Sequence, residues 1–210
     1  MNIAKIASIN INGISAHTRV GMLTDFIRSH ELDIVFLQEV INPEIFNITG
    51  YTTHLNIGTI MPGTAIIARH DFPITNIATV PSGRAIAADC TGIRLVNVYA
   101  PSGTTRRVER ERFFISELPE LFYAASRSML IGGDFNCVLQ PADTTGPFTT
   151  SRALSEIIRG LALVDTWNQD PLRPTSTHHF PTGATRIDRF FCPKNYWCAK
   201  LVFKSFPPHS

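Results

Sequence analysis

The sequence predicts an α/β domain in which strands and helices pack in layers. Short apolar runs of strand length recur along the chain, and segments with apolar residues at helical spacing lie between them. Helices that alternate with buried strands are typical of layered α/β domains. The chain has 210 residues, 44% of them hydrophobic, and no Gly/Ser-rich linker divides it. These values predict a single domain over residues 1–210 with one substantial core.

The strands are predicted from apolar runs and from the residues that stop them. The first shows strict alternation of apolar and polar residues and ends in a glycine turn. The run 33–39 is continuously apolar up to Gln38, as in an interior strand, and Pro101 stops the strand that ends at Tyr99. Strands are expected near residues 3–9, 33–38, 64–69, 84–90, 93–99, 128–133, 185–192 and 198–206.

Three helices are predicted from apolar residues that recur at intervals of three and four. Pro119 lies within the second and is expected to kink or restart it. The apolar stripes consist of Val20, Leu23, Phe26 and Ile27 in the first helix, Phe113, Phe114, Leu118, Leu121 and Phe122 in the second, and Ala153, Leu154, Ile157, Ile158 and Leu161 in the third.

Several predicted strands end on side chains that can bind a metal ion or hydrogen-bond a phosphate. Gly133-Asp134-Phe135-Asn136 follows the run Met129-Leu130-Ile131. Residues two positions apart point to the same side of an extended chain, so a carboxylate and an amide could together hold one water or phosphate oxygen. The same reasoning places Asn10 and Asn12 on one face. The other polar residues at or within strand ends are Glu39, Tyr99 and Asp188.

Each of these residues also has a purely structural interpretation. Asn10 and Asn12, like Asp134 and Asn136, are common turn formers. The alternatives for the others are a helix cap for Glu39, a core position for Tyr99, and an ion pair with Arg186 or Arg189 for Asp188. Five polar strand ends with one geometry favour a functional cluster over five separate turns.

Taken together, these motifs resemble those of a known family. The segments Asn10-Ile11-Asn12-Gly13, Leu37-Gln38-Glu39, Asn97-Val98-Tyr99-Ala100-Pro101, Gly133-Asp134-Phe135-Asn136 and Arg186-Ile187-Asp188 resemble, in order and spacing, the motifs of the endonuclease/exonuclease/phosphatase superfamily. Within it, the chain looks most like the apurinic-type endonuclease domain of non-LTR, LINE-like retrotransposons. Relatives that repair abasic sites usually carry Asp at the position of Asn12 and Trp at the position of Ile9, which favours the retrotransposon branch.

The resemblance implies a fold and an activity. The expected fold is a four-layer α/β sandwich, in which two mixed β-sheets pack face to face with helices outside and the active site at one edge. The expected activity is a Mg²⁺-dependent endonuclease, with Mn²⁺ as an alternative ion, that nicks one strand of double-stranded DNA. The nick leaves a 3′-hydroxyl that primes reverse transcription by a polymerase fused downstream, and the expected location is the nucleus.

Hydrolysis of a phosphodiester requires charge neutralisation on the phosphate, an aimed water and a stabilised leaving oxygen. Glu39 is the candidate metal ligand, because Mg²⁺ commonly binds through one or two protein carboxylates, and Asn12 adds a neutral oxygen. By resemblance, Asp134 with Asn136 positions or deprotonates the water. Also by resemblance, Asn10 and Tyr99 contact the phosphate, and Thr177 lies near the DNA.

The chain has only a weak excess of positive charge. The formal net charge is +2, and a broad electrostatic DNA-binding surface would be more basic. Phosphate contacts are therefore expected from local clusters. Arg106, Arg107, Arg110 and Arg112 alternate with Glu109 and Glu111, which favours a solvated helix face. The second cluster lies nearer the predicted site and is the candidate DNA-binding group: Arg186, Arg189, Lys194, Lys200 and Lys204.

Asp188 raises a question about activity. Its counterpart in the family supports a histidine of a C-terminal Ser-Asp-His triplet. This sequence ends at Pro207-Pro208-His209-Ser210, so Ser210 matches the first residue of that triplet and the last two are expected to be missing. Loss of a general acid or base typically costs about 10²- to 10⁴-fold in rate. His209 is a possible substitute, but a frayed terminus is favoured, and for His178 and His179 a polar turn is favoured over such a role.

Other features limit the alternatives. No apolar stretch approaches the length of a membrane span, and no signal-peptide pattern precedes the first strand, which predicts an intracellular protein without membrane contact. Cys90, Cys137, Cys192 and Cys198 form no Cys-x-x-Cys pair. Reduced thiols in packing positions are therefore expected rather than a zinc site.

Three hypotheses for function follow. The first is the retrotransposon-type DNA endonuclease. The second is a catalytically inactive fragment that keeps the fold. The third is an abasic-site repair nuclease or another phosphoesterase of the same superfamily.

Overall fold

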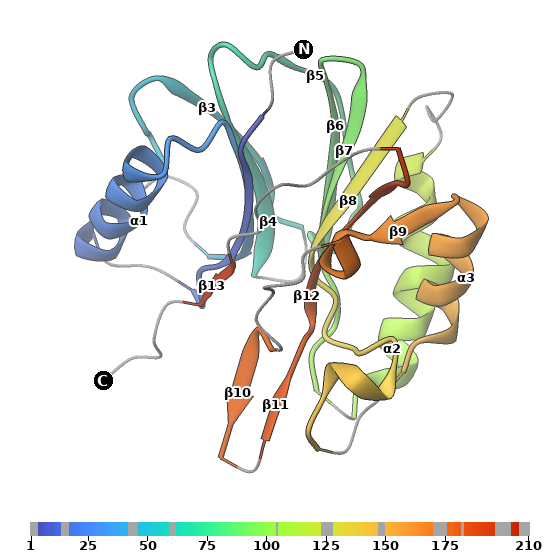
Figure 1. Cartoon of the computed structure of the whole chain (residues 1–210). Helices are drawn as coiled ribbons and strands as arrows, with labels where there is room; N and C mark the ends of the chain where they lie inside the picture. The colour runs from blue at the N-terminus through green and yellow to red at the C-terminus, as the bar shows by residue number, and fades with distance from the viewer. Residues whose placement is uncertain are drawn as a thin grey trace.

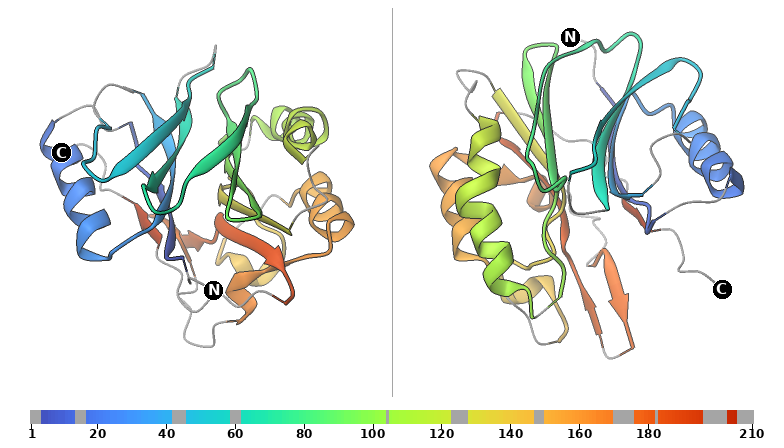
Figure 2. Two further views of the ribbon diagram at one scale, coloured as in Figure 1. Left: turned by 90° about the horizontal axis from the view of Figure 1, so that it is seen from above. Right: turned by 180° about the vertical axis from the view of Figure 1, so that it is seen from behind.

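Two β-sheets lie face to face in the computed structural model, with helices on the outer side of each (Figure 1). Seen from above, the layers follow one another as α1, first sheet, second sheet, and then α2 with α3 (Figure 2). This arrangement confirms the predicted four-layer α/β sandwich. The structure describes residues 4–13, 17–41, 46–58, 62–103, 105–122, 128–146, 150–169, 176–181, 183–195 and 203–205.

The first sheet, called sheet A here, has the order β13-β1-β2-β4-β3. β13, β1 and β2 run parallel, whereas β4 and β3 are antiparallel to their neighbours, so the sheet is mixed. The strands of sheet A are β1 (Ile6–Asn10), β2 (Ile34–Val40), β3 (Tyr51–Asn56), β4 (Gly63–Arg69) and β13 (Phe203–Ser205).

The second sheet, called sheet B, has the order β5-β6-β7-β8-β12-β9. Only β7 and β8 are parallel, so this sheet is also mixed. Its strands are β5 (Ile74–Thr79), β6 (Ala85–Cys90), β7 (Ile93–Tyr99), β8 (Ser128–Asp134), β9 (Leu163–Asp165) and β12 (Asp188–Pro193).

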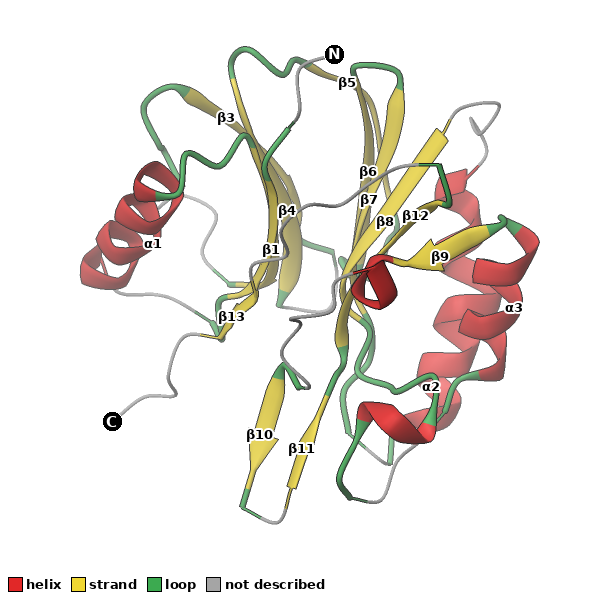
Figure 3. Cartoon of the chain, in the orientation of Figure 1, coloured by secondary structure: helices red, strands yellow, loops and turns green. Residues whose placement is uncertain are grey.

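A two-stranded hairpin of β10 (His178–Phe180) and β11 (Gly183–Thr185) is separate from both sheets. It projects from the end of the molecule at which β1 and β8 end (Figure 3). The expected strand 185–192 is therefore divided between the end of β11 and β12. The expected strand 198–206 is described only over β13, because its other residues lie outside the described ranges.

The three predicted helical segments are present as α1 (His17–Ser29), α2 (Arg107–Arg112) and α3 (Arg152–Gly160). α2 begins before the predicted apolar stripe and continues as a π-helical turn over Phe113–Glu117 and a 3₁₀ turn over Leu118–Phe122. Pro119 lies in the 3₁₀ turn, near the point where the helix was expected to kink. No helix in the described part of the chain is long and apolar enough to cross a membrane.

Strand alternation divides the apolar side chains among three clusters. In β2, Val35 and Leu37 pack toward α1, whereas Ile34 and Phe36 face sheet B. In β8, Met129 and Ile131 pack toward α2 and α3, whereas Leu130 faces sheet A. Because successive side chains of a strand point to opposite faces, each strand supplies both an outer cluster and the cluster between the sheets.

Toward one end of the sandwich, the inward-facing positions change from apolar to polar. The period of two continues from Leu130 to Asp134 in β8 and from Leu95 to Tyr99 in β7. The same parity makes Asp188 of β12 an inward position, because Phe190 and Cys192 belong to the cluster between the sheets. Polar side chains of both sheets therefore meet at this end.

Candidate active site

The candidate site lies where β1 and β2 of sheet A and β7 and β8 of sheet B end. β7 runs parallel to β8, with Tyr99 opposite Asp134, so both strands end at the same edge. β12 is antiparallel to β8, and its first residue, Asp188, lies opposite Asp134. The predicted residues Asn10 and Glu39 approach this group from sheet A.

Asn10 connects the two sheets at this site. Its Nδ2 donates to Oε1 of Glu39 at 2.9 Å and to Oδ2 of Asp134 at 3.1 Å. One amide group thus holds a carboxylate of each sheet, and both carboxylates keep further oxygen lone pairs for other partners.

The strand ends at Asn10 and Asp134 have the same local construction. The backbone N–H of Asn12 donates to Oδ1 of Asn10, and that of Asn136 donates to Oδ1 of Asp134, both at 2.9 Å. Asn12 and Asn136 adopt positive φ values of 48° and 49°, a conformation that asparagine tolerates well. The turn-forming interpretation and the site interpretation therefore hold together for Asn10 and Asp134.

This geometry corrects one expectation. Asn12 lies beyond the end of β1 in the left-handed conformation, so the period of two does not place it on the same strand face as Asn10. Asn136 likewise follows the end of β8, and its Nδ2 donates to the backbone oxygen of Ala100 at 2.9 Å. Its side chain ties the turn after β8 to the turn after β7.

Glu39 reaches the site through a β-bulge. The pairing of β2 with β4 shifts register between Gln38 and Val40, and Glu39 has a φ of 60°. A positive φ is uncommon for a residue other than Gly, Asn or Asp, and bulges re-aim side chains. Simple alternation would turn Glu39 away from Gln38 toward α1, but the bulge brings its carboxylate to Asn10. The alternative of a helix cap for Glu39 is wrong.

Tyr99 is buried, as a core residue would be, and also lies close to the acidic groups of the site. Burial raises the pKa of its phenol, and the charges of Glu39 and Asp134 raise this pKa further. The guanidinium of Arg84 lies 5.5 Å from the centroid of the Tyr99 ring and acts in the opposite direction. The phenol therefore stays protonated at neutral pH and can donate a hydrogen bond.

Asp134 and Asp188 form a cross-strand pair of carboxyl groups. Burial raises the pKa of Asp134 to about 6, helped by the charge of Glu39 and opposed by the hydrogen bonds from Asn136 and Asn10. Burial and the charge of Asp134 raise the pKa of Asp188. Two carboxyl groups that face one another resist simultaneous ionisation, so the pair holds a proton more readily than isolated carboxyl groups do.

Arg186 and Arg189 do not face the site, which contradicts their predicted role in DNA binding. They are 2% and 1% exposed, and their guanidinium groups form ion pairs with Asp143 and Asp165. Arg189 follows Asp188 in β12 and therefore points to the opposite face of sheet B. The alternative ion pair of Asp188 with Arg186 or Arg189 is not seen either, because both guanidinium groups pair with Asp143 and Asp165.

The role of Arg110 was not predicted from the sequence. The side chain is 1% exposed and its Nη1 donates to the backbone oxygens of Pro101 at 2.9 Å and Gly103 at 3.3 Å. The expectation of a solvated face is wrong for this residue. Its spacing of three and four residues from the buried Phe113 and Phe114 places it on the buried helix face. Arg110 thus fixes the loop after Tyr99, and its charge lowers the pKa of Asp134.

The remaining candidates lie at the edge of the site. Thr177 accepts the backbone N–H groups of Ile187 and Asp188 at its Oγ1, both at 3.1 Å. His178 and His179 are exposed residues of strand β10 rather than part of a polar turn. Lys194 is exposed at the end of β12. Lys200, the side chain of Lys204, His209 and Ser210 lie outside the described residues.

The donor set fits a hard divalent cation. No group of three His, Cys, Asp or Glu side chains suited to a metal occurs in the described ranges, but Mg²⁺ is commonly held through one or two carboxylates and keeps several waters. Glu39 offers an oxygen ligand beside Asn10, and repulsion between neighbouring negative charges adds to burial in raising the pKa values of Tyr99, Asp134 and Asp188. A bound cation would relieve this repulsion.

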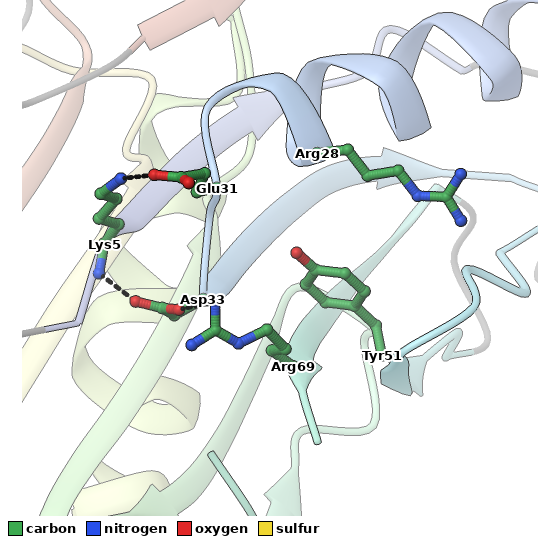
Figure 4. Close-up of a pocket in the computed structure, with 6 residues that line it drawn as sticks. All are labelled: Lys5, Arg28, Glu31, Asp33, Tyr51 and Arg69. Atoms are coloured by element: carbon green, nitrogen blue, oxygen red, sulfur yellow. Dashed lines mark hydrogen bonds and ion pairs between the residues drawn. The ribbon is translucent and has the colours of Figure 1, made fainter. Parts of the chain in front are cut away.

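A polar hollow at the opposite end of sheet A does not belong to this site. Its lining residues come from the last turn of α1 and from the far ends of the sheet A strands: Lys5, Arg28, Glu31, Asp33, Tyr51 and Arg69 (Figure 4). Lys5 contacts Glu31 through Nζ at 2.5 Å and Asp33 through its backbone N–H at 2.7 Å, and Arg69 pairs with Asp33 at 2.9 Å. These contacts fasten the turn between α1 and β2.

The cysteines that the structure describes, Cys90, Cys137 and Cys192, are buried, as expected for packing positions. Cys198 lies outside the described residues. Burial raises the pKa of the Cys137 thiol to about 12, so this side chain acts as a packing residue behind the site.

Solved structures share the fold at low sequence identity. An AP endonuclease from Archaeoglobus fulgidus is similar with a TM-score of 0.76 and 18% identity, over 90% of this chain and 86% of that chain. The 3′ phosphatase NExo from Neisseria bound to a product DNA hairpin gives 0.77 and 20%, over 91% and 87%. The catalytic domain of Xenopus laevis APE2 gives 0.72 and 19%, over 90% and 82%.

No curated protein sequence matches the chain significantly. The family model of the endonuclease/exonuclease/phosphatase family matches residues 7–210. That match includes both sheets and every residue of the candidate site, so the chain belongs to the endonuclease/exonuclease/phosphatase family.

Proposed function

We propose that this protein is a metal-dependent endonuclease that hydrolyses one strand of double-stranded DNA and leaves a 3′-hydroxyl. The observation that carries the proposal is the bridge from Asn10 to Glu39 and Asp134, which unites an acidic group of each sheet at one open edge. Metal-dependent hydrolysis of phosphodiesters is usual in this family, and the DNA-bound neighbour supports DNA as the partner.

Asp134 is the proposed base for the attacking water. Its two oxygens are oriented by the Asn136 backbone N–H and the Asn10 amide. Its raised pKa of about 6 lies close to neutral pH, where a general base combines ionisation with a strong affinity for the proton. Proton transfer from water to Asp134 would generate the nucleophile in line with the scissile phosphate.

Asn10 and Tyr99 are the proposed phosphate-binding donors. The phenol of Tyr99 remains protonated because its pKa is raised, so it can donate to a non-bridging oxygen. Asp188 faces Asp134 across β12 and β8 and is the proposed proton donor to the departing oxygen, since burial and the charge of Asp134 raise its pKa. Thr177 would keep Asp188 in place through the backbone of β12.

Glu39 is the residue that would hold the metal ion, with Asn12 as a proposed second oxygen ligand. When bound, the ion would neutralise charge on the phosphate oxygens. Magnesium is the proposed ion and manganese the alternative.

The biological setting is proposed separately from the chemistry. Asn12 and Ile9 favour an endonuclease of a LINE-like retrotransposon, acting in the nucleus together with a reverse transcriptase. Repair of abasic sites is an equally strong candidate, because the fold matches an AP endonuclease over most of both chains.

Cleavage of matched duplex oligonucleotides tests these assignments. One duplex is intact and the other contains a single abasic site, and both are incubated with wild type and with Asp134→Asn in Mg²⁺. Equal cleavage of both duplexes supports the retrotransposon-type activity, and strong preference for the abasic duplex supports repair. Cleavage of neither, with hydrolysis of a small sugar phosphate instead, overturns the proposal.

A further inference from the structure

The candidate site depends on how the two sheets are held relative to each other. Asn10 and Glu39 belong to sheet A, whereas Tyr99, Asp134 and Asp188 belong to sheet B. Backbone hydrogen bonds fix positions within a sheet but not between sheets. The apolar cluster between the sheets, which includes Phe36 and Phe190, resists separation but gives no directional contact.

A row of polar side chains crosses the interface close to the site. Gln38, Thr64 and Asn56 lie side by side, because Gln38 pairs with Thr64 across β2 and β4, and Thr64 pairs with Asn56 across β4 and β3. All three are buried and donate to groups of sheet B or its loops. We call these three residues the polar row.

The outer members of the polar row bind backbone oxygens. Thr64 Oγ1 donates to Gly83 at 3.0 Å. Asn56 Nδ2 donates to Val80 at 2.9 Å and to Ala85 at 2.7 Å. These contacts join β3 and β4 to the chain around the start of β6, two strands away from the carboxylates of the site.

The member nearest the site binds a second amide. Gln38 Nε2 donates to Oδ1 of Asn97 at 2.7 Å, and both residues are 0% exposed. Asn97 Nδ2 in turn donates to the backbone oxygens of Leu37 at 2.9 Å and Ala65 at 2.8 Å. Asn97 is thus clamped to β2 and β4 by three hydrogen bonds, which demand one separation and one orientation of the sheets.

This pair lies directly behind the site residues of each sheet. Gln38 precedes Glu39 and lies opposite Asn10 in the pairing of β1 with β2. Asn97 lies two residues before Tyr99 on the same strand face and opposite Gly132 of β8, two residues before Asp134. A change in the distance between Gln38 and Asn97 would therefore move Glu39 and Asn10 relative to Tyr99 and Asp134, since only one or two residues separate them.

We propose that Gln38 and Asn97 are positioning residues that set the distance from Glu39 and Asn10 to Tyr99 and Asp134. The inference rests on the proposed function in that it assigns these residues to the same reaction. Neither side chain reaches the substrate, since both are fully buried. Their effect is on the geometry of the residues that do.

The test compares Gln38→Met with Asn56→Leu, a matched control in the same polar row. Both substitutions keep approximate volume and remove buried hydrogen bonds between the sheets, but only Gln38 adjoins the site. Thermal unfolding, kcat and KM on duplex DNA, and a crystal structure are measured for each. The double variant Gln38→Met with Asn97→Leu, in which both amides are replaced by apolar groups, is measured alongside.

The expected result is a fall in kcat of about 10²-fold for Gln38→Met, with KM within threefold, because a displacement of about 1 Å in a site has effects of this size. Asn56→Leu is expected to lose similar thermal stability but to keep kcat within threefold. The double variant removes the half-paired amide of Asn97, but it also removes the donor to the Leu37 and Ala65 oxygens, so kcat should stay low whether or not stability recovers.

Two outcomes would overturn the inference. One is that kcat falls equally in Gln38→Met and Asn56→Leu, or recovers with stability in the double variant. The other is a crystal structure of Gln38→Met in which the separation of Glu39 and Asp134 matches that of wild type. The structural comparison decides the inference even if wild type cleaves no DNA, an outcome that would count against the proposed function alone.

Discussion

Asn10 shows how one residue can serve both as a turn former and as part of a site. Its Oδ1 accepts the backbone N–H of Asn12 and so closes the turn after β1, which leaves Nδ2 free to bind Glu39 and Asp134. Asp134 repeats the arrangement in sheet B. A turn-forming propensity and a functional role therefore need not be alternatives when the turn itself aims the side chain.

Asp134→Asn is the most direct test at this scale. We expect cleavage to fall by about 10²- to 10⁴-fold, because the variant retains the turn but loses the base. The folded-state pKa of Asp134 is raised to about 6, so its contribution to stability is present at low pH and is lost as pH rises through that value. In EDTA, the unfolding free energy of the variant relative to wild type should therefore rise from about pH 4 to about pH 6 and level off above about pH 7.

The control for this prediction is Asn76→Ala, an exposed position on β5, the edge strand of sheet B farthest from β8 and β12 in the strand order. Its cleavage rate should match that of wild type. The assignment of Asp134 is wrong if Asp134→Asn cuts DNA at the wild-type rate. It is also wrong if the unfolding free energy of the variant falls relative to that of wild type as pH rises.

Most site residues could be predicted from the sequence, but the positions of the two arginines could not. Asn10, Tyr99, Asp134 and Asp188 could be identified because each ends or begins a strand. Glu39 was identified from its place after an apolar run, but the bulge that turns its side chain toward the site could not be predicted from the period. Arg186 and Arg189 looked like a basic surface because their partners, Asp143 and Asp165, lie more than 20 residues away in the sequence. Formal charge alone does not distinguish a solvated cation from a buried one.

At the scale of the elements, the strand β8 shows how a tight backbone positions a carboxylate. Gly133 has a φ of 131°, and a Cβ on it would lie 2.0 Å from the backbone oxygen of Val98 in β7. Only glycine allows β7 and β8 to approach this closely immediately before Asp134. The double glycine of the sequence is thus required by the strand that carries the site.

Gly133→Ala is expected to destabilise the fold by about 3 kcal/mol or more, through strain and the backbone clash. Gly21→Ala is the matched control, because Gly21 lies within α1 and has open space around its Cα. Alanine there should stabilise the protein by about 0.5–1 kcal/mol. Denaturant unfolding of both variants measures these values, and equal stability of the two would refute the packing argument.

The buried ion-pair cluster anchors the segment before β12. Burial alone would raise the pKa of Asp143, but Arg189 and Arg186 together hold it below its usual range. A lowered folded-state pKa means that the stabilisation is present above the unfolded pKa and is lost as pH falls through the folded value. Asp143 is therefore one source of acid sensitivity in this fold.

Asp143→Asn should lower the unfolding free energy by about 3 kcal/mol at pH 7, because the buried guanidinium groups of Arg186 and Arg189 lose one of their carboxylate partners. The difference in unfolding free energy between the variant and wild type should become smaller as pH falls below about 4. Urea unfolding between pH 3 and pH 7 measures both effects. If this difference in unfolding free energy becomes larger as pH falls, the assigned role of the ion pairs is wrong.

The predicted elements were correct where apolar patterns are strong and incomplete where they are weak. β2, β7 and β8 are interior strands with continuous buried runs and were found within one or two residues. β3 and β5 were missed because they are edge strands with mostly exposed or half-exposed residues. β9, β10 and β11 are three residues long and too short to show a period.

At the scale of the molecule, two sheets that each supply part of an acidic site make metal binding and stability interdependent. Burial is the main cause of the raised pKa values of Tyr99, Asp134 and Asp188, and repulsion among the acidic groups at this edge adds to it. A cation that binds only the folded protein stabilises it by mass action. The packing between the sheets must otherwise oppose this repulsion alone.

Mg²⁺ should therefore raise the melting temperature of the wild-type protein. At a concentration about ten times the dissociation constant, the gain is about 1.4 kcal/mol, or roughly 3–6 °C for a chain of this size. The shift should disappear in Glu39→Gln, and Ca²⁺ should produce a similar shift if only charge matters. An identical Mg²⁺ shift in wild type and Glu39→Gln would place the ion elsewhere.

We propose that the residues joined by Asn10 hydrolyse DNA with the help of a metal ion. Nicking of supercoiled plasmid decides this, measured for wild type, Asp134→Asn and Glu39→Gln, each in Mg²⁺ and in EDTA, with folding of all three checked by circular dichroism. Open-circular product is expected from wild type in Mg²⁺ alone. Nicking that persists in EDTA or in both variants, or no nicking by folded wild type, would contradict it.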